Sequence, residues 1–324
     1  MQTALALELP GALAPSHPLS DLAALPSHSP PLLRRSLLLA LAGAGLQACA
    51  VAGPAASPCR SAQFGLSSAD GHRRYRVQLL LPPARPPAAG YPLLVMLDGN
   101  AAFSALTDAP LARQAETSPL AIATLGYETE QDLDVTARAF DYTPPVPGES
   151  PTWDDAQRQR PAGGADLFLD LIAQQVLPTI GQHAPCDPAR TTLWGHSYGG
   201  LLALYTLFTR PQLFARYAAA DPSLWWHDGH LLSIEERARP LPGGQPTQLL
   251  LMAGGAGTAT RSQRPGMDEE ARSRRAMLSD ATPKMAERQG RRAGLDVRFQ
   301  SFPGVGHGPM RQASIPPTLA FAAA

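Results

Sequence analysis

The sequence contains little charge and almost no lysine. Charged side chains account for 17% of the 324 residues, and Lys284 is the only lysine. The 27 basic and 27 acidic residues cancel, so the chain lacks the overall basic field with which nucleic acid binders displace counterions from phosphates. We therefore expect no nucleic acid partner.

Cysteine is also scarce. The three cysteines, Cys49, Cys59 and Cys186, are too few for a disulfide scaffold, and no two of them have C-x-x-C spacing. This spacing argues against structural zinc and against thioredoxin chemistry. The sequence predicts neither a metal nor a cofactor.

The apolar run at residues 37–46 is too short to cross a membrane as a helix, which needs about 20 apolar residues. It follows Arg34-Arg35, a partial twin-arginine pattern, and precedes small residues, an order typical of an export signal. We predict that residues 1–52 are an export signal or flexible leader and that residues 53–324 form one periplasmic domain. A buried helix of the fold is the alternative interpretation of the run.

Two fates of this leader remain open. Residues 46–49, Leu-Gln-Ala-Cys, are similar to a bacterial lipobox, in which Cys49 would carry a lipid anchor. Cleavage at a small-x-small site within residues 48–52 would instead release a soluble protein. Export would place Cys59 and Cys186 in an oxidising compartment, where we predict a disulfide between them, with two free thiols as the alternative.

Short apolar runs along the rest of the chain predict an alternation of strands and helices. The runs at 93–97 and 249–252 are continuously apolar, as in a parallel sheet whose two faces are both covered by helices. Asp70-Gly71 separates the first two strands and predicts a hairpin. We expect an α/β fold with a mostly parallel central sheet flanked by helices, with helices at 166–180, 199–208 and 269–290 and strands at 61–67, 75–81, 93–97, 121–126, 191–194, 216–220, 248–253 and 296–302.

One segment carries the most specific signal in the chain. Residues 191–200 read Thr-Thr-Leu-Trp-Gly-His-Ser-Tyr-Gly-Gly, which places G-x-S-x-G between a predicted strand and a predicted apolar helix. The sharp turn requires small residues at Gly195 and Gly199 and holds the serine at the carboxyl end of the sheet. We predict that Ser197 is a nucleophile, and a glycine-rich turn without a catalytic role is the alternative.

A serine hydroxyl needs a base within hydrogen-bonding distance. Among the eight histidines, His307 follows the last predicted strand within a glycine-rich loop, where this architecture places its base. We therefore predict that His307 takes the proton of Ser197. A solvated or structural histidine is the alternative.

The sequence does not reveal an acid where the chain order predicts one. The strand that ends near Ala253 is followed by Gly-Gly-Ala-Gly-Thr, without a carboxylate. Asp268 and Glu269 are the next candidates, although a first helical turn stabilised by the helix dipole explains them as well. A Ser–His dyad is the other expectation, because loss of the acid damages a triad less than loss of the serine or histidine.

Two backbone N–H groups are expected to bind the oxyanion. One belongs to Tyr198, which follows the nucleophile, and the helix that begins there directs its free N–H groups at the site. The other belongs to Asn100, in the turn after the third strand, where Gly99 lets the backbone bend toward the site. A simple turn is the alternative interpretation of this segment.

With these residues in place, the chain from about residue 64 to residue 310 resembles the putative-esterase group of α/β-hydrolases, and within it the periplasmic siderophore esterases of the IroE type. The resemblance rests on six motifs in the same order: 97–101 (LDGNA), 138–144 (RAFDYTP), 163–166 (GGAD), 195–200 (GHSYGG), 222–226 (PSLWW) and 302–308 (FPGVGHG). Where that family commonly has Ser-Pro-Ser, this chain has Asp221-Pro222-Ser223.

The resemblance implies an α/β-hydrolase catalytic domain that cleaves the ester bonds of catecholate trilactone siderophores with a Ser–His pair. A ferric catecholate is anionic and aromatic, so Arg138 and the indoles of Trp225 and Trp226 are candidate substrate contacts. Pairing of Arg138 with a nearby Asp, and burial of the tryptophans, are the alternatives. A general carboxylesterase or an acyltransferase for other esters is the alternative function, and a binding lipoprotein on a degenerate hydrolase fold is a third.

Overall fold

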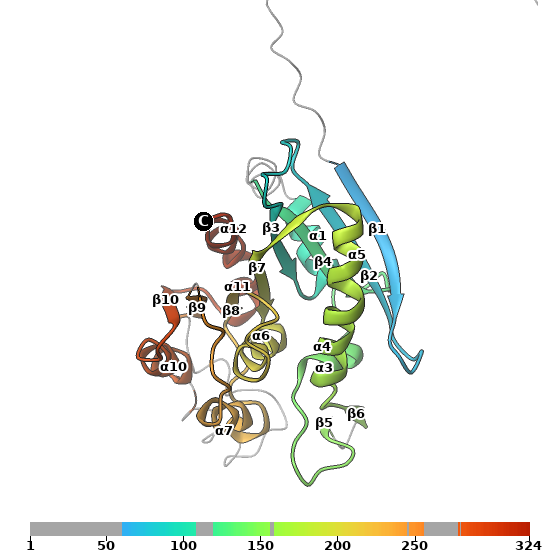
Figure 1. Ribbon diagram of the computed structural model, residues 1–324. Coiled ribbons are helices and arrows are strands. Elements are labelled where there is room, and N and C mark those ends of the chain that lie inside the picture. The colour runs from blue at the N-terminus through green and yellow to red at the C-terminus, as the bar shows by residue number, and fades with distance from the viewer. Residues whose placement is uncertain (1–59, 108–118, 156–158, 245, 256–277, 279) are drawn as a thin grey trace, which may run out of the picture. The chain divides into compact units, whose positions relative to one another are not determined.

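Figure 1 shows the computed structural model, which describes residues 60–107, 119–155, 159–244, 246–255, 278 and 280–324. An eight-stranded sheet carries the fold, with the strand order β1-β2-β4-β3-β7-β8-β9-β10. The strands are β1 (Arg60–Ser67), β2 (Arg74–Leu81), β3 (Tyr91–Met96), β4 (Ala121–Tyr127), β7 (Cys186–His196), β8 (Arg216–Ala220), β9 (Thr247–Gly254) and β10 (Leu295–Phe302).

The strand directions confirm the predicted hairpin and the mostly parallel sheet. Strands β1 and β2 pair antiparallel, as do β2 and β4, and every pair from β4 to β10 is parallel. All residues of β3 and β4 are buried, because both faces of these central strands are covered. The carboxyl ends of the parallel strands therefore lie along one edge of the sheet.

Helices cover both faces of the sheet and enclose two apolar cores. One face packs against α3 (Val135–Tyr142), α4 (Ala165–Leu171), α5 (Leu177–His183), α6 (Tyr198–Thr209), α7 (His230–Glu236) and α10 (Ala281–Gln289). The other face packs against α1 (Gly99–Thr107), α11 (His307–Ala313) and α12 (Ile315–Ala323). The π-helical η1 (Ile172–Val176), the 3-10 helix η2 (Trp226–Gly229) and the hairpin of β5 (Trp153–Asp155) and β6 (Arg160–Pro161) complete the described elements.

Most differences from the predicted elements concern helices, and the short strands β5 and β6 were not predicted either. The helix expected at 166–180 is divided by the π-helical turn η1, and the described part of the helix expected at 269–290 is α10. Helices α1, α3, α7, α11 and α12 were not predicted. They are seven to nine residues long, too short to give a sustained helical period, and α11 and α12 contain proline or glycine.

No helix within the described residues is long and apolar enough to span a membrane. The predicted leader, its boundary at residue 52, Cys49 and Cys59 all lie outside the described residues. The thiol of Cys186 is half-buried at the start of β7, and burial raises its pKa to about 11. The Cys59–Cys186 disulfide stays a prediction.

The connection between β7 and α6 is a single residue in a strained conformation. Ser197 has φ 62° and ψ −115°, a combination that a residue with a side chain rarely adopts. The turn closes because Gly195 lets the main chain approach itself, whereas a Cβ on the other glycine expected to be required, Gly199, would meet no atom closer than 3.5 Å. A Cβ on Gly195 would lie 2.2 Å from the carbonyl carbon of Gly199.

The substitution Gly195→Ala tests this packing. Because the colliding atom belongs to the main chain, no side-chain rotation relieves the contact. We expect a loss of about 1–3 kcal/mol in the free energy of unfolding, measured by urea denaturation, together with lost labelling by a fluorophosphonate probe.

The matched control is Gly181→Ala, in helix α5, where an added Cβ meets no atom within 4 Å. It should gain about 0.5–1 kcal/mol, because alanine favours a helix more than glycine does. Unchanged stability and labelling in Gly195→Ala would contradict the packing argument.

Candidate active site

Ser197 lies at the carboxyl end of β7, and its backbone is bonded on both sides. Its N–H donates to the carbonyl of Ala220 on β8 (3.0 Å), and its own carbonyl accepts from Leu201 N (2.9 Å) and Ser223 N (3.1 Å). These bonds hold the strained residue in place. Its hydroxyl lies 3.1 Å from the hydroxyl of Ser223, which is fully buried.

The imidazole of His307 approaches this hydroxyl from the first residue of α11. Its Nε2 lies 3.0 Å from Ser197 Oγ, although 110 residues separate the two in the sequence. The two predicted catalytic residues are thus brought to hydrogen-bonding distance. This is the nucleophile–base contact that serine hydrolases require.

A carboxylate lies behind the imidazole. Asp221 Oδ2 is 2.6 Å from His307 Nδ1, and the Asp221 side chain is almost fully buried at 2% exposure. The residue follows β8 directly, has φ 46°, and donates its N–H to the carbonyl of Met252 at 2.7 Å. Since a carboxylate only accepts, Nδ1 carries the hydrogen and Nε2 is left to accept the proton of Ser197.

A second histidine, His196, contacts the base. The His196 ring lies 4.8 Å from the His307 ring, and its Nε2 donates to the backbone carbonyl of His307 at 2.7 Å. Burial, followed by the charge of His307, holds the pKa of His196 well below its usual range, so it is neutral. Ligand-type atoms of His196, Asp221 and His307 lie within 4.8 Å of one another, but His196 Nε2 and both ring nitrogens of His307 already form hydrogen bonds within the site.

The two residues predicted to supply oxyanion donors lie at the beginnings of neighbouring helices. Tyr198 begins α6, and Asn100 is the second residue of α1, where N–H groups have no carbonyl partner inside the helix. The α1 turn lies close to the nucleophile turn, since a Cβ on Gly199 would be 3.9 Å from Asp98 Oδ2. The Asn100 side chain itself holds the next loop, donating to the carbonyls of Thr129 and Gln131.

The indole and guanidinium groups expected to touch substrate differ in their surroundings. Arg138 is 9% exposed and forms two hydrogen bonds with Asp98, Nε to Oδ1 and NH2 to Oδ2, each 2.8 Å long. Trp226 is 2% exposed and donates its Nε1–H to Asp154 at 3.0 Å. Trp225 is partly exposed, and its ring lies 6.1 Å from the Tyr198 ring.

Comparisons with known proteins place this geometry in a family. The family described as "Putative esterase" matches residues 68–245, more than half of the chain. The apo-salmochelin esterase of Escherichia coli O6:H1 (strain CFT073) is 34% identical over 249 residues, which cover 76% of this chain and 74% of that protein. The ferri-bacillibactin esterase BesA of Bacillus subtilis (strain 168) is 32% identical and covers 75% of this chain and 82% of that protein.

The chain belongs to this esterase family. A solved structure of the enterobactin hydrolase IroE in complex with DFP is 31% identical, with a TM-score of 0.61, and covers 82% of this chain and 95% of that one. The predicted α/β-hydrolase fold and the predicted family are therefore confirmed, and the protein is a serine hydrolase that acts on carboxylic esters.

Within the esterase, two predicted substrate contacts lie in the surroundings that their alternatives describe. Arg138 is occupied by Asp98, and Trp226 is a core residue with its own hydrogen-bond partner. An extended segment points adjacent side chains in opposite directions, which is why only Trp225 of the pair reaches the partly exposed side. Trp225 stays a predicted contact.

Asp221 was not among the predicted acids. Asp268 and Glu269 lie outside the described residues, and the chain order predicts an acid after β9, whereas the observed carboxylate follows the neighbouring strand β8. One signal was available. Asp221 is where the chain departs from the Ser-Pro-Ser of similar enzymes, so the site has the carboxylate that a dyad would lack.

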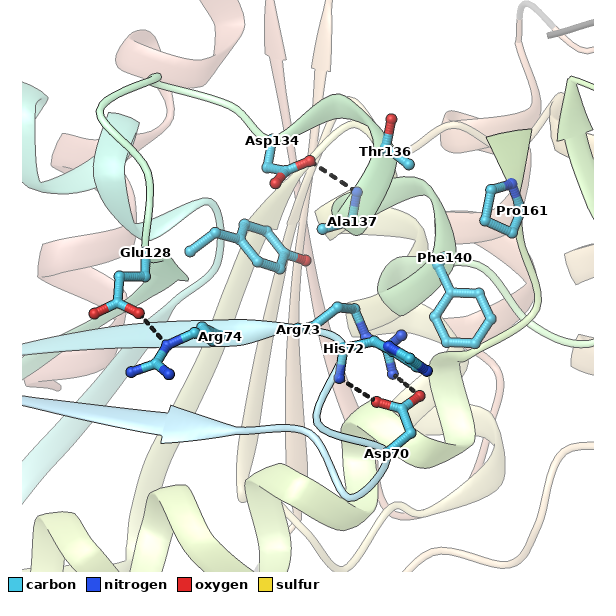
Figure 2. A pocket seen from close by; sticks show the side chains of 11 residues that line it. Asp70, His72, Arg73, Arg74, Glu128, Asp134, Thr136, Ala137, Phe140 and Pro161 are labelled. Carbon is cyan, nitrogen blue, oxygen red and sulfur yellow. Dashed lines mark hydrogen bonds and ion pairs between the residues drawn. The ribbon is translucent and has the colours of Figure 1, made fainter. Parts of the chain in front are cut away.

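A hollow lies along the same edge of the sheet, between the β1–β2 turn and α3. It has a volume of about 580 Å³ and is lined by Arg73, Arg74, Tyr127, Glu128 and Phe140, among others (Figure 2). The Arg73 guanidinium lies 4.4 Å above the Phe140 ring and pairs with Asp70 at the rim. None of the hydrogen bonds described for these residues reaches Ser197 or His307.

The Asp221 geometry predicts the effect of Asp221→Asn. An amide can present its NH2 group to Nδ1 and so favours the wrong tautomer of His307, and kcat should fall about 10⁴-fold, as in the serine proteases. Ser197→Ala should cost roughly a hundredfold more than removal of the acid. The measurement is steady-state hydrolysis of a chromogenic ester.

The matched controls are Asp268→Asn and Glu269→Gln, which should leave kcat unchanged. If either control variant loses activity while Asp221→Asn keeps it, the acid is not Asp221.

Proposed function

We propose that this esterase hydrolyses the ester bonds of catecholate trilactone siderophores through an acyl-enzyme on Ser197. The hydrogen-bonded series Ser197–His307–Asp221 carries the proposal. Its chemistry agrees with relatives named for siderophores, the apo-salmochelin and ferri-bacillibactin esterases. The substrate would be the free or the ferric form of such a molecule, and no cofactor enters the steps.

The first half-reaction opens the lactone. Ser197 Oγ attacks the ester carbonyl carbon while its proton passes to His307 Nε2, and Asp221 stabilises the imidazolium through Nδ1–H. The carbonyl oxygen becomes an oxyanion, which the backbone N–H groups of Tyr198 and Asn100 would bind. When the C–O bond breaks, the departing alkoxide takes the proton from Nε2 and the acyl group remains on Ser197.

The second half-reaction restores the enzyme. A water molecule gives one proton to His307 Nε2 and attacks the acyl carbon, forming a second oxyanion in the same place. Collapse of this intermediate breaks the bond to Ser197 Oγ, and the serine takes back its proton. The products are a carboxylic acid and an alcohol on one opened chain, because the substrate was a ring.

Recognition of the substrate must depend on local groups, since the formal net charge of the chain is zero. Trp225 is the candidate for a catechol ring, because its partly exposed indole lies beside Tyr198, next to the nucleophile. The buried Asp98–Arg138 pair is neutral overall and offers no free charge to an anionic ligand.

We also propose that the enzyme works in the periplasm. Paired arginines, a ten-residue apolar run and small residues support an export signal at the start of the chain. Translocation by the twin-arginine route and lipidation of Cys49 are two forms of this proposal. Fractionation of cells, with mass determination of the exported protein, distinguishes a lipidated Cys49 from cleavage nearby.

The substrate proposal is tested by turnover of enterobactin, salmochelin and short acyl esters, with chromatography of the products. We expect linear and then shorter fragments from the trilactones, at a higher kcat/KM than for the short esters. Ser197→Ala should abolish all of these products and all labelling by a fluorophosphonate.

The outcomes separate the alternatives. A preference for simple acyl esters would indicate a general carboxylesterase, and transfer of the acyl group to an added alcohol would indicate an acyltransferase. Wild-type protein that is neither labelled nor active would indicate a binding protein on a hydrolase fold.

A further inference from the structure

Arg138 and Asp98 form a buried ion pair between α3 and the turn that begins α1. The two hydrogen bonds are parallel and equal in length, 2.8 Å, and the two residues are 9% and 4% exposed. Burial acts to lower the pKa of the Arg138 guanidinium, but the adjacent Asp98 carboxylate raises it above its usual range, so the guanidinium is charged.

The carboxylate partner belongs to the residue that sets the direction of the α1 turn. Asp98 has φ 52°, a left-handed conformation unusual for a residue with a Cβ. Its N–H donates to the Tyr142 hydroxyl at 3.0 Å, and its carbonyl accepts from Ala102 N at 3.0 Å. Asp98 is therefore held at its side chain, its N–H and its carbonyl, and it sets the direction of the N–H groups of Gly99 and Asn100, which follow it.

The same guanidinium contacts the other side of the site. Its central carbon lies 5.3 Å from the centre of the Tyr198 ring and 5.5 Å from that of Tyr142. Tyr198 is fixed at its far end as well, because its hydroxyl donates to the buried carboxylate of Asp154 at 2.6 Å. Arg138 thus lies between the residue that begins α6 and the residue that precedes α1.

We propose that Arg138 is a positioning residue that holds the two oxyanion-binding turns, at Asp98 to Asn100 and at Tyr198, at a fixed separation. The inference rests on the proposed mechanism and extends it to a residue that does not touch substrate. Asp98 neutralises the guanidinium, so Arg138 acts through geometry and not through its own field. An oxyanion site depends on donors that are already in place when the charge develops.

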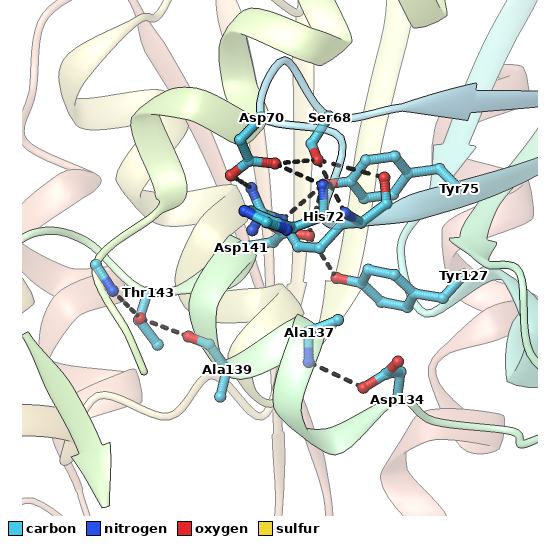
Figure 3. A network of polar contacts seen from close by, with 12 residues as sticks. Ser68, Asp70, His72, Tyr75, Tyr127, Asp134, Ala137, Ala139, Asp141 and Thr143 are labelled. Atoms are coloured by element: carbon cyan, nitrogen blue, oxygen red, sulfur yellow. Dashed lines mark hydrogen bonds and ion pairs between the residues drawn. The ribbon is translucent and has the colours of Figure 1, made fainter. Parts of the chain in front are cut away.

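A buried ion pair gives weak evidence of stabilisation, because both charges lose their hydration. Removal of one partner, however, leaves the other charge buried and destabilises the protein. The effect of an Arg138 substitution on activity must therefore be distinguished from its effect on stability, and a second buried ion pair provides the control. Asp141 lies on α3, as Arg138 does, and pairs at 3.0 Å with Arg73 from the turn between β1 and β2. Asp141 also accepts from the hydroxyls of Tyr75 and Tyr127 (Figure 3). Neither Arg73 nor Asp141 has a described hydrogen bond to Asp98, Arg138 or Tyr198.

The test compares full-length Arg138→Met with Arg73→Met. Each variant is measured for kcat and KM on a chromogenic ester, for the Kd of phenylboronic acid, and for Tm. Boronate bound to a serine is tetrahedral and negatively charged, so its affinity reports on the oxyanion site. In Arg138→Met we expect kcat to fall about 10²–10³-fold, as for loss of one oxyanion donor, with the boronate Kd rising in parallel and KM nearly unchanged.

Arg73→Met should lower Tm but keep kcat and the boronate Kd. Two further variants of Arg138 keep the test decisive if the methionine variant folds poorly. Arg138→Lys should recover only part of kcat, since an ammonium cannot form the two parallel bonds. Added guanidinium chloride at millimolar concentration should raise kcat of Arg138→Ala and not of Arg73→Ala.

Three results would overturn the inference. A rise in KM with kcat retained would make Arg138 a substrate contact, and equal losses of kcat in the Arg138 and Arg73 variants would make it structural. Full activity of Arg138→Met would remove any role. Failure of the proposed function itself would be seen elsewhere, as activity that persists in Ser197→Ala.

Discussion

The register between β7 and β8 is the constraint on which the active site depends. His196 pairs with Ala220, so the next residues on the two strands are Ser197 and Asp221. The backbone bonds continue the pairing past the strand ends, from Ser197 N to Ala220 O and from Ser223 N to Ser197 O. The nucleophile and the acid are therefore placed by adjacent parallel strands, and one residue of slip between them would separate the two. Only the histidine has to come from a distant part of the chain.

The parts of the fold that were predictable are those with a strong local signal. The continuously apolar runs at 93–97 and 249–252 show the strand character of β3 and β9 in the sequence, and Gly195 precedes Ser197 where the turn leaves no room for a Cβ. Helices such as α3 were not predictable in this way. That helix has four buried residues, of which Arg138 and Asp141 are charged, so its buried face does not appear apolar in the sequence.

The site residues also differ in how strong their local sequence signal is. Ser197 and His307 could be located because the position of each follows from the order of strands along the chain. For Arg138 and Trp226 the sequence allowed two interpretations, contact with substrate or pairing inside the fold, because the partner of such a side chain is not visible in the sequence. Their partners, Asp98 and Asp154, are 40 and 72 residues distant in the sequence. Only the folded chain shows that these carboxylates accept hydrogen bonds from the Arg138 guanidinium and the Trp226 indole.

The position of the acid has a steric reason. A Cβ on Gly254, the last residue of β9, would lie 2.5 Å from the carbonyl oxygen of Val305, and one on Gly255 would lie 2.9 Å from Pro303 Cα. Both contacts are with the main chain of the loop that carries His307. The end of β9, where the strand order predicts an acid, is thus filled by the loop that delivers the base. A side chain at either glycine would displace the loop that carries His307, and the carboxylate that contacts the imidazole comes from Asp221, directly after the neighbouring strand β8.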